Sequence, residues 1–309
     1  MTTLTASLRN QLQKAVQQAR VAAEQGARQA LEALAVHHHE PWGSMDAEQR
    51  QLRRRLRAHG RQLGDALEAQ SGKQRLERLV EEVGYEFWHR MLFARFLAEN
   101  ELLIEAEYGV PISFAECEEL AREKGQDPWA YAAGLAQAML PQIFRSDSPA
   151  LQLSLPPEHQ LRLVRLLEDL PAETFRASDA LGWVYQFWQT SRRDEVNAAG
   201  NKIGARELPA VTQLFTEPYM VSFLLDNALG AWWAARRLSE DDLKRAETEQ
   251  ELRDKAAIPG VALEYLRFVR AEDGTWAPAA GTFERWPDQL AELKVLDPCC
   301  GSGHFLVAV

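Results

Sequence analysis

Apolar residues recur at helical spacing through the first two hundred residues of the chain. From Thr3 to Val36, leucines and valines lie three or four positions apart among Gln, Arg, Glu and Ala, which predicts a long amphipathic helix interrupted at Gly26. Alternating strand patterns are scarce, and Pro and Gly separate the helical stretches. Further helices are predicted over residues 47–69, 73–103, 113–124, 128–143, 157–168 and 177–190. This part of the chain should therefore be an all-helical domain.

The predicted helix over residues 73–103 carries an aromatic cluster, Phe87, Trp88, Phe93 and Phe96. These rings have the spacing of residues that face a core, so buried packing is the simpler interpretation. Stacking on nucleic-acid bases is the alternative.

The pattern changes in a polar, glycine-bearing stretch over residues 191–209, which we interpret as a domain boundary. It separates a helical domain of residues 1–205 from a second domain of residues 206–309. The second domain is predicted to contain a helix over 217–237, an acidic and basic helix over 239–255 and a short helix over 287–292. The pair Asp273-Gly274 indicates a β-hairpin, and residues 294–296 form a predicted strand.

The composition is that of a globular chain with a substantial core. Hydrophobic residues make up 46% of the 309 residues, with nine Trp and twelve Phe. No stretch approaches the roughly 20 apolar residues of a membrane span, and the first ten residues lack the plan of a secretory signal. We therefore expect a soluble, cytoplasmic protein that does not engage a membrane.

Neither a disulfide scaffold nor a metal site is predicted. The three cysteines are Cys117, Cys299 and Cys300, and an adjacent pair cannot bridge without a strained ring, which fits a reducing cytoplasm. No Cys and His spacing is typical of zinc. Three consecutive histidines at 37–39 cannot share one helix face and precede Pro-Trp-Gly, so we interpret them as a loop, with metal capture as the alternative.

The net charge of −10 argues against nucleic-acid binding through the overall field of the chain. Local charge reverses this between residues 50 and 61, where six arginines occur without an acid. On a helix, five of them share one face. They form a candidate DNA-contacting ridge, and a merely solvated helix face is the alternative. These five candidates are Arg50, Arg53, Arg54, Arg57 and Arg61.

The most specific pattern in the chain is its last strip, K-V-L-D-P-C-C-G-S-G-H-F-L-V-A-V over residues 294–309. A short apolar run ends in Asp297, and a turn with Gly301 and Gly303 opens a second apolar run. A glycine turn at a helix start favours a nucleotide-type ligand with an anionic group. A dinucleotide fingerprint fails because Leu306 occupies its third glycine position, and a P-loop fails because His304 follows Gly303.

The segment D-P-x-x-G-S-G-x-F, residues 297–305, resembles motif I, the cofactor-binding motif of amino-methylating DNA methyltransferases that use S-adenosylmethionine. In this resemblance the helix start faces the methionine carboxylate and Asp297 faces the ammonium. The alternative is that Asp297 only caps the turn and that Pro298 fixes a bend. The resemblance implies the cofactor-binding residues Asp297, Pro298, Gly301, Gly303 and Phe305.

A second stretch, F-T-E-P at residues 215–218, resembles motif X of the same enzymes, usually written around Phe-Thr-Pro. The resemblance implies that Phe215 and Thr216 line the cofactor pocket, with Glu217 as a variable residue. Taken alone the stretch is a good helix start. Thr216 can accept from first-turn N–H groups, Pro218 suits the first turn, and Phe215 can pack on Met220.

The arrangement as a whole resembles the front half of the large adenine-specific DNA methyltransferases of phage-defence systems, those of the BREX (PglX) and class 1 DISARM type. The resemblance is good from about residue 181 to 309 and thin before residue 75. It implies a mainly α chain, in which the helical domain precedes the start of a truncated Rossmann-like methyltransferase domain. The motif X helix, the hairpin and the first strand would make up that start.

The function implied is transfer of a methyl group from S-adenosylmethionine to N6 of adenine in double-stranded DNA, together with other phage-defence proteins. The family grips the amine with a motif such as Asn-Pro-Pro-Tyr, and this chain has only Leu155-Pro156-Pro157. No catalytic residue is therefore assigned, and the ribose-binding acid is also missing. We expect the 309 residues to be inactive alone, as part of a longer polypeptide.

Two alternatives remain open from the sequence. One is a helical adaptor that docks other defence proteins without catalysis. The other is a methyltransferase that acts on RNA or on a protein glutamine through similar motifs.

Overall fold

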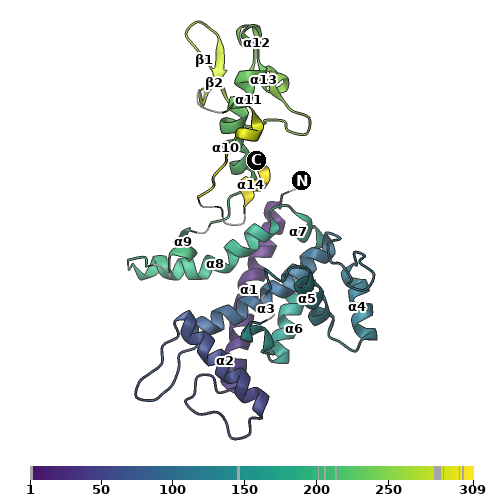
Figure 1. Ribbon diagram of the computed structural model, residues 1–309, viewed down its shortest axis with the longest axis vertical. Coiled ribbons are helices and arrows are strands. Elements are labelled where there is room, and N and C mark those ends of the chain that lie inside the picture. The colour runs from purple at the N-terminus through teal and green to yellow at the C-terminus, as the bar shows by residue number, and fades with distance from the viewer. Residues whose placement is uncertain are drawn as a thin grey trace. The chain divides into compact units, whose positions relative to one another are not determined.

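The computed structural model describes residues 3–144, 147–200, 202–204, 207–212, 214–281, 287, 289–298, 300 and 303–309. The chain divides into two compact units, unit 1 at residues 1–210 and unit 2 at residues 211–309. The predicted boundary at residues 205 and 206 lies close to this division. Both units are mainly helical, as predicted, and Figure 1 shows their elements.

Unit 1 is a helical assembly built around its first helix. Its described elements are α1 (Ala6–Ala33), α2 (Ala47–Leu63), α3 (Glu77–Glu99), α4 (Phe114–Glu123), α5 (Pro128–Met139), a 3₁₀ turn (Pro149–Gln152), α6 (Pro157–Glu168), α7 (Ala172–Arg176) and α8 (Ala180–Ala199). Helix α1 packs against α3, α6 and α8 and buries Leu12, Val16 and Leu31. Figure 1 shows α1 running through the middle of unit 1.

The interruption predicted at Gly26 is wrong, because α1 continues through this residue. A Cβ atom at Gly26 would lie 2.8 Å from the Cβ of His159 in α6. Glycine is therefore used here for the close approach of two helices, a use that the sequence pattern does not distinguish from a break.

The ends of several helices differ from the prediction for local reasons. Helix α2 stops at Leu63 rather than near residue 69, because Gly64 takes a left-handed φ of 101° and caps the helix. Helix α3 begins at Glu77 rather than at residue 73, since the Gln74 N–H bonds to the His37 carbonyl oxygen at 2.9 Å. Helix α8 runs to Ala199 and takes up much of the stretch that we interpreted as a polar boundary.

The aromatic cluster of α3 belongs to the core, as the simpler interpretation predicted. Trp88 is fully buried and stacks on Trp188 of α8, with ring centroids 6.5 Å apart. Phe93 contacts the buried ring of Phe144.

Unit 2 combines short helices with one hairpin. Its described elements are α10 (Pro218–Leu225), a π-helical turn (Asp226–Gly230), α11 (Ala231–Arg237), α12 (Glu240–Arg245), α13 (Glu249–Ala256), β1 (Phe268–Arg270), β2 (Trp276–Pro278), a 3₁₀ turn (Leu290–Glu292) and α14 (His304–Ala308). Helix α9 (Leu208–Thr212) lies across the division between the units. The core of unit 2 buries Leu252, Leu263, Leu266 and Phe268.

The structure confirms the hairpin, in which β1 and β2 pair antiparallel with Val269 opposite Ala277. The single helix predicted over 239–255 is wrong. It is divided into α12 and α13, because Thr248 starts a new helix by accepting a hydrogen bond from the Glu251 N–H at 3.3 Å.

The strand predicted at residues 294–296 is also absent from the structure. These residues adopt no regular conformation, and the Leu296 side chain is 86% exposed. A strand needs a neighbour to satisfy its backbone groups, and no described strand pairs with this segment. Within the described ranges, no helix combines the length and apolar content needed to cross a membrane.

Candidate functional site

The glycine turn of the motif I segment leads directly into α14. The Gly303 N–H donates to the Cys300 carbonyl oxygen at 2.8 Å and closes the turn. Gly303 has a left-handed φ of 82° and is the N-cap residue of α14, which confirms the positive φ expected there. Gly301 lies outside the described residues.

The other residues predicted in motif I lie at or near the surface of this segment. Asp297 and Phe305 are half-buried, and Pro298 is exposed. Because Gly303 is the N-cap of α14, Asp297 does not cap this helix. The segment therefore has a half-buried carboxylate before the turn and a helix start after it.

The motif X stretch precedes α10, and its helix start differs from the sequence-based expectation. Pro218 occupies the first turn, as predicted. Thr216 was expected to cap the helix, but the N-cap is Glu217 with φ −63° and ψ 144°. Thr216 thus lies one residue before the cap, and its hydroxyl makes no hydrogen bond with the described residues. The prediction that Thr216 caps α10 is therefore wrong.

The two motifs, far apart in the sequence, meet in unit 2. Helix α14 lies against α10, so the turn that follows Asp297 and the segment that contains Phe215 and Thr216 lead into packed helices. Figure 1 shows α10 and α14 as neighbours. This juxtaposition is what a pocket shared by both motifs would need.

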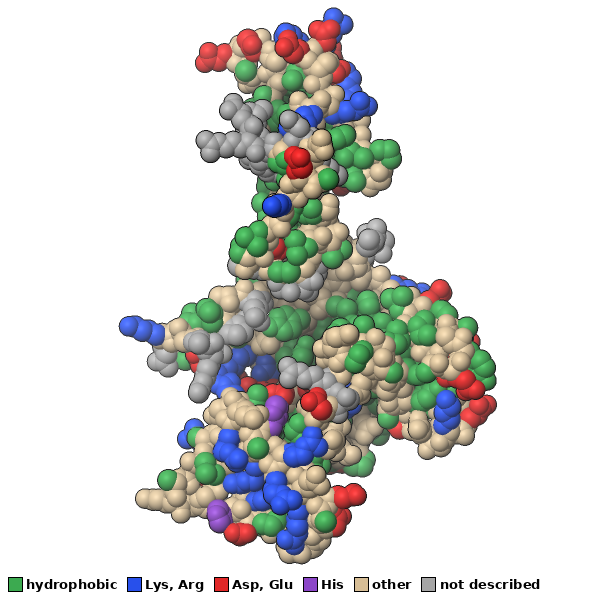
Figure 2. All heavy atoms as spheres, viewed as in Figure 1, with side chains coloured by type: hydrophobic (Ala, Val, Ile, Leu, Met, Phe, Trp, Pro, Cys, Tyr) green, Lys and Arg blue, Asp and Glu red, His purple; other side chains and the backbone are tan. Residues whose placement is uncertain are grey.

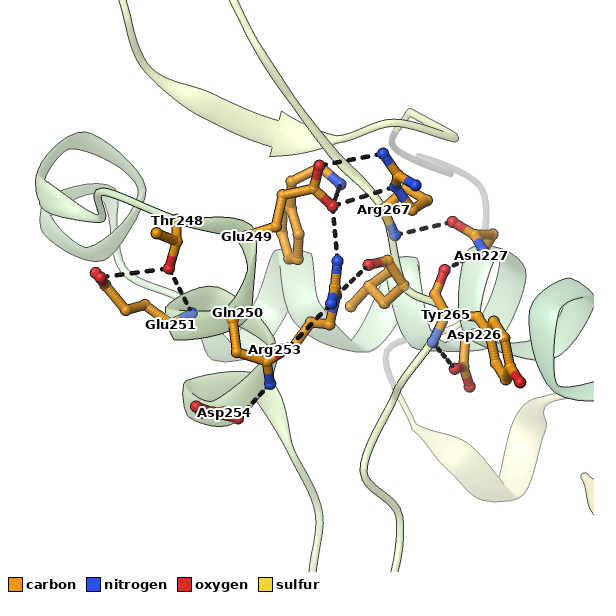
Figure 3. Close-up of polar contacts among 12 residues, drawn as sticks. Asp226, Asn227, Thr248, Glu249, Gln250, Glu251, Arg253, Asp254, Tyr265 and Arg267 are labelled. Atoms are coloured by element: carbon orange, nitrogen blue, oxygen red, sulfur yellow. Dashed lines mark hydrogen bonds and ion pairs between the residues drawn. The ribbon is translucent and has the colours of Figure 1, made fainter.

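Two residues that sequence reasoning missed hold the end of α10 in place. Asp226 and Asn227 form the start of the π-helical turn that follows this helix. The Asn227 side chain donates to the carbonyl oxygen of Tyr265 at 2.7 Å and accepts from the N–H of Arg267 at 3.0 Å. These two bonds imitate the pairing of a neighbouring strand, as Figure 3 shows.

Asp226 adds a third bond to the same segment. Its carboxylate is 8% exposed and accepts from the Tyr265 N–H at 2.9 Å. Burial raises the pKa of Asp226, and the Tyr265 N–H partly offsets that rise. A polar pair inside an otherwise apolar helical run was the signal in the sequence that could have identified these residues.

An ionic network on α13 fixes the other side of the segment at residues 263–268. Arg253 donates through Nε to the Leu266 carbonyl oxygen at 2.7 Å and pairs with Glu249 at 2.8 Å. Arg267 pairs with Glu249 at 3.2 Å (Figure 3). Burial raises the pKa of Glu249, but the hydrogen bond from Arg253, the Phe268 N–H and the charge of Arg267 outweigh it, and the net pKa is lowered.

The arginine candidates on α2 do not all face solvent. Arg53 is 6% exposed and Arg57 half-buried, and both donate to backbone carbonyls of nearby loops. Arg50, Arg54 and Arg61 are exposed. The shared outward face predicted for all five is therefore wrong for Arg53, because the loop after α1 needs donors for its carbonyl groups. Whether the others contact DNA stays a prediction.

The three-histidine segment forms a loop, as predicted. His38 contacts Trp42, with ring centroids 5.0 Å apart, and His39 pairs with Glu40 at 2.9 Å. Among the residues that the structure describes, no group of three His, Cys, Asp or Glu side chains is arranged to hold a metal ion.

Comparison with known proteins finds two relatives, and both are named adenine-specific methyltransferases. Over 211 residues the chain is 29% identical to the adenine-specific methyltransferase BrxX of Escherichia coli O9:H4 (strain HS), which covers 65% of this chain and 16% of the relative. Over 272 residues it is 25% identical to the adenine-specific methyltransferase PglX of Lacticaseibacillus casei (strain Zhang), which covers 75% of this chain and 22% of the relative.

The chain thus spans less than a quarter of the length of these relatives. No family model matches the chain, and no solved structure matches it. The resemblance that the sequence motifs indicated, to large adenine-specific methyltransferases of the BREX type, is confirmed by these two relatives.

Proposed function

We propose that this chain is part of a methyltransferase that transfers a methyl group from S-adenosylmethionine to N6 of adenine in double-stranded DNA, within a cytoplasmic phage-defence system. Unit 1 would be a helical domain in front of the enzyme. Unit 2 would contribute one side of the cofactor pocket, at the start of a Rossmann-like domain. Catalytic residues would lie outside these 309 residues, so the chain alone should not methylate DNA.

The observation that carries this proposal is the contact between α10 and α14. It brings together two segments that resemble motifs X and I and that are about eighty residues apart in the sequence. The names of the two relatives support the same reaction. A chance match to one glycine turn would not require the second motif to pack beside it.

The described residues fit one wall of such a pocket. The carboxylate of Asp297 would hold the ammonium group of the cofactor, and the backbone around Gly303 would lie along its methionine portion. Phe215 and Thr216 would line the pocket from the α10 side, while Pro298 and Phe305 would shape the turn and its helix. S-adenosylmethionine, when bound, supplies an electrophilic methyl group.

Calorimetry on the longer protein that contains this chain tests cofactor binding. Asp297→Ala and Phe215→Ala should each weaken the affinity for S-adenosylmethionine by about tenfold or more, which corresponds to about 1.4 kcal/mol. Asp254→Ala is the matched control, because Asp254 is exposed and only bonds the side chain of Gln250.

Two outcomes would contradict the proposal. Absence of cofactor binding in the longer protein would favour a docking module without catalysis. Unchanged affinity in both variants would remove the assigned pocket. Long-read sequencing of host DNA with and without the gene tests the reaction itself, since deletion should abolish N6-methyladenine at a defined sequence motif.

A further inference from the structure

Helix α2 carries a stripe of arginines along most of its length. Arg50, Arg54, Arg57 and Arg61 are spaced by three or four residues and therefore lie on one side of the helix, over about 16 Å at the rise of an α-helix. No acidic residue occurs from residue 49 to 64. Figure 2 shows Lys and Arg side chains gathered on the part of unit 1 where Figure 1 places α2.

Two arginines of α2, the buried Arg53 and the half-buried Arg57, organise two loops, which we call the histidine loop (residues 34–45) and the glycine loop (residues 64–76). Arg53 donates from Nε to the Ala35 carbonyl oxygen at 2.9 Å and from Nη2 to the His39 carbonyl oxygen at 2.9 Å. Arg57 donates to the carbonyl oxygens of Val36 at 2.7 Å and Gly72 at 3.2 Å. Arg57 thus joins the two loops.

The loops also contact each other directly. The Gln74 N–H donates to the His37 carbonyl oxygen at 2.9 Å. Gly72 has a φ of 66°, and a Cβ atom there would overlap the ring of His39. The two loops and α2 therefore form a single fixed surface, in which Arg53 and Arg57 are positioning residues.

This surface has exposed cationic side chains with few partners among the described residues. Arg54 is exposed and has no hydrogen bond or ion pair with any described residue. Arg61 has one hydrogen bond, to Oε1 of Gln74 at 3.2 Å, so most of its donors remain. Lys73 and Arg75 are exposed on the glycine loop, and Trp42 is 40% exposed on the histidine loop.

Acidic groups near this surface neutralise little of that charge. Glu40 pairs with His39, Glu68 accepts from the Ser71 hydroxyl at 2.7 Å, and Asp46 caps the start of α2 beside Glu48. The pKa of Arg57 is lowered by burial and then by repulsion from Arg53 and Arg61. Repulsion among these cations, with no acid within the helix stripe, favours an external anion.

We propose that α2 and its two loops form a binding surface for duplex DNA, in which Arg54 and Arg61 contact phosphates and Arg53 and Arg57 only position the loops. The linear stripe suits the regular phosphates of a duplex backbone, and an exposed Trp beside cations suits a nucleic-acid ligand. The choice of DNA over other polyanions rests on the proposed function.

Fluorescence anisotropy on the 309-residue chain tests this surface, with a labelled duplex of about 30 base pairs and salt from about 50 to about 200 mM. Arg54→Ala/Arg61→Ala should weaken binding and reduce the slope of log affinity against log salt by about 1.8, that is, about 0.9 for each phosphate that the chain no longer neutralises. The control is Arg162→Ala/Arg165→Ala, an exposed pair on α6, which should leave affinity and slope unchanged.

The positioning role of Arg57 has its own measurement. Arg57→Ala should make residues 34–45 and 64–76 more sensitive to limited proteolysis, and Arg54→Ala should not, because only Arg57 bonds to both loops.

Three results would overturn the proposal: no binding to duplex DNA by the folded chain, equal losses in the α2 and α6 pairs, or polyglutamate binding as tight as DNA binding. None of them bears on cofactor binding, which calorimetry measures separately. A failure of this surface is therefore distinguishable from a failure of the proposed methyl transfer.

Discussion

Units 1 and 2 are stabilised in different ways. Unit 1 buries large side chains between long helices, and Trp88, Leu12, Leu31 and Phe144 are almost completely inaccessible. Unit 2 has a smaller core and relies on side chains that bond to the backbone, such as Asn227. It also exposes large apolar side chains on α10 and α14, namely Tyr219, Met220, Phe223, Leu224, Leu306 and Val307.

Unit 1 thus has the features of a rigid scaffold, and unit 2 has apolar side chains available for contact with further residues or partners. Burial of aromatic and aliphatic side chains between long helices contributes most of the stability of unit 1, and buried arginines such as Arg20 and Arg53 add bonds to its backbone. Directed hydrogen bonds in unit 2 fix the place of α10, where the motif X segment leads. Mutations should therefore affect the two units through different mechanisms.

The largest effect should come from the core of unit 1. Trp88→Ala removes a fully buried ring and should lower the free energy of unfolding by about 3–5 kcal/mol, as measured by denaturant unfolding. Trp88→Phe should cost much less, because the Nε1 atom of Trp88 has no hydrogen-bond partner among the described residues. Equal costs for the two variants would show that packing of the ring does not dominate. The amide exchange rates of unit 2 should not change in either variant.

A smaller effect should follow from acid. Burial lowers the pKa of His89 to about 4, where it lies against Tyr85, Phe93 and Phe144. The unfolded chain therefore protonates His89 at a higher pH than the folded chain does. The contribution of neutral His89 to the free energy of unfolding is present above about pH 6.5, and about 3 kcal/mol of it is lost as the pH falls towards 4.

Thermal unfolding of unit 1 between pH 7 and 4.5 checks this expectation. His89→Phe should flatten the pH dependence while retaining the ring contacts. In unit 2, the lowered pKa of Glu249 and of Asp273 means that their stabilisation is lost only when the pH falls below the usual carboxyl range. A parallel loss in unit 2 over this pH interval would contradict the contrast.

The smallest effect should come from the bonds around Asn227 in unit 2. Asn227→Ala removes the partners of the Tyr265 carbonyl oxygen and the Arg267 N–H, and should cost about 2 kcal/mol. Asn227→Asp keeps the acceptor for Arg267 and should retain part of this stability. Hydrogen exchange at the Arg267 amide distinguishes the two, since it should accelerate only in the alanine variant.

The helical character of the chain could be predicted from its periodicity, because helices depend on local spacing of apolar residues. The helix predicted over residues 157–168 has the same first and last residues as α6, and Pro157 marks its start. Gly26 was misread because a glycine that permits close packing on α6 looks the same in sequence as one that breaks a helix. The strand at residues 294–296 depended on distant partners, which no local pattern supplies.

In the candidate site, too, the features set by local sequence could be predicted and those set by distant residues could not. The positive φ at Gly303 follows from local turn chemistry and was predictable. The burial of Arg53 was not, because it depends on carbonyl groups of a loop eighteen residues earlier. Asn227 was missed for a similar reason, since its partners Tyr265 and Arg267 lie about forty residues later.

The central position of α1 has a consequence for synthesis on the ribosome. Its buried Arg20 donates to the carbonyl oxygen of Trp188 at 2.6 Å, across 168 residues, and the Leu4 N–H bonds to Asp179. At about 5–20 residues per second, translation leaves this first helix without its last partner for on the order of ten seconds or more. During that interval part of its apolar side has no partner, so we expect the nascent chain to be prone to aggregation until α8 has emerged from the exit tunnel.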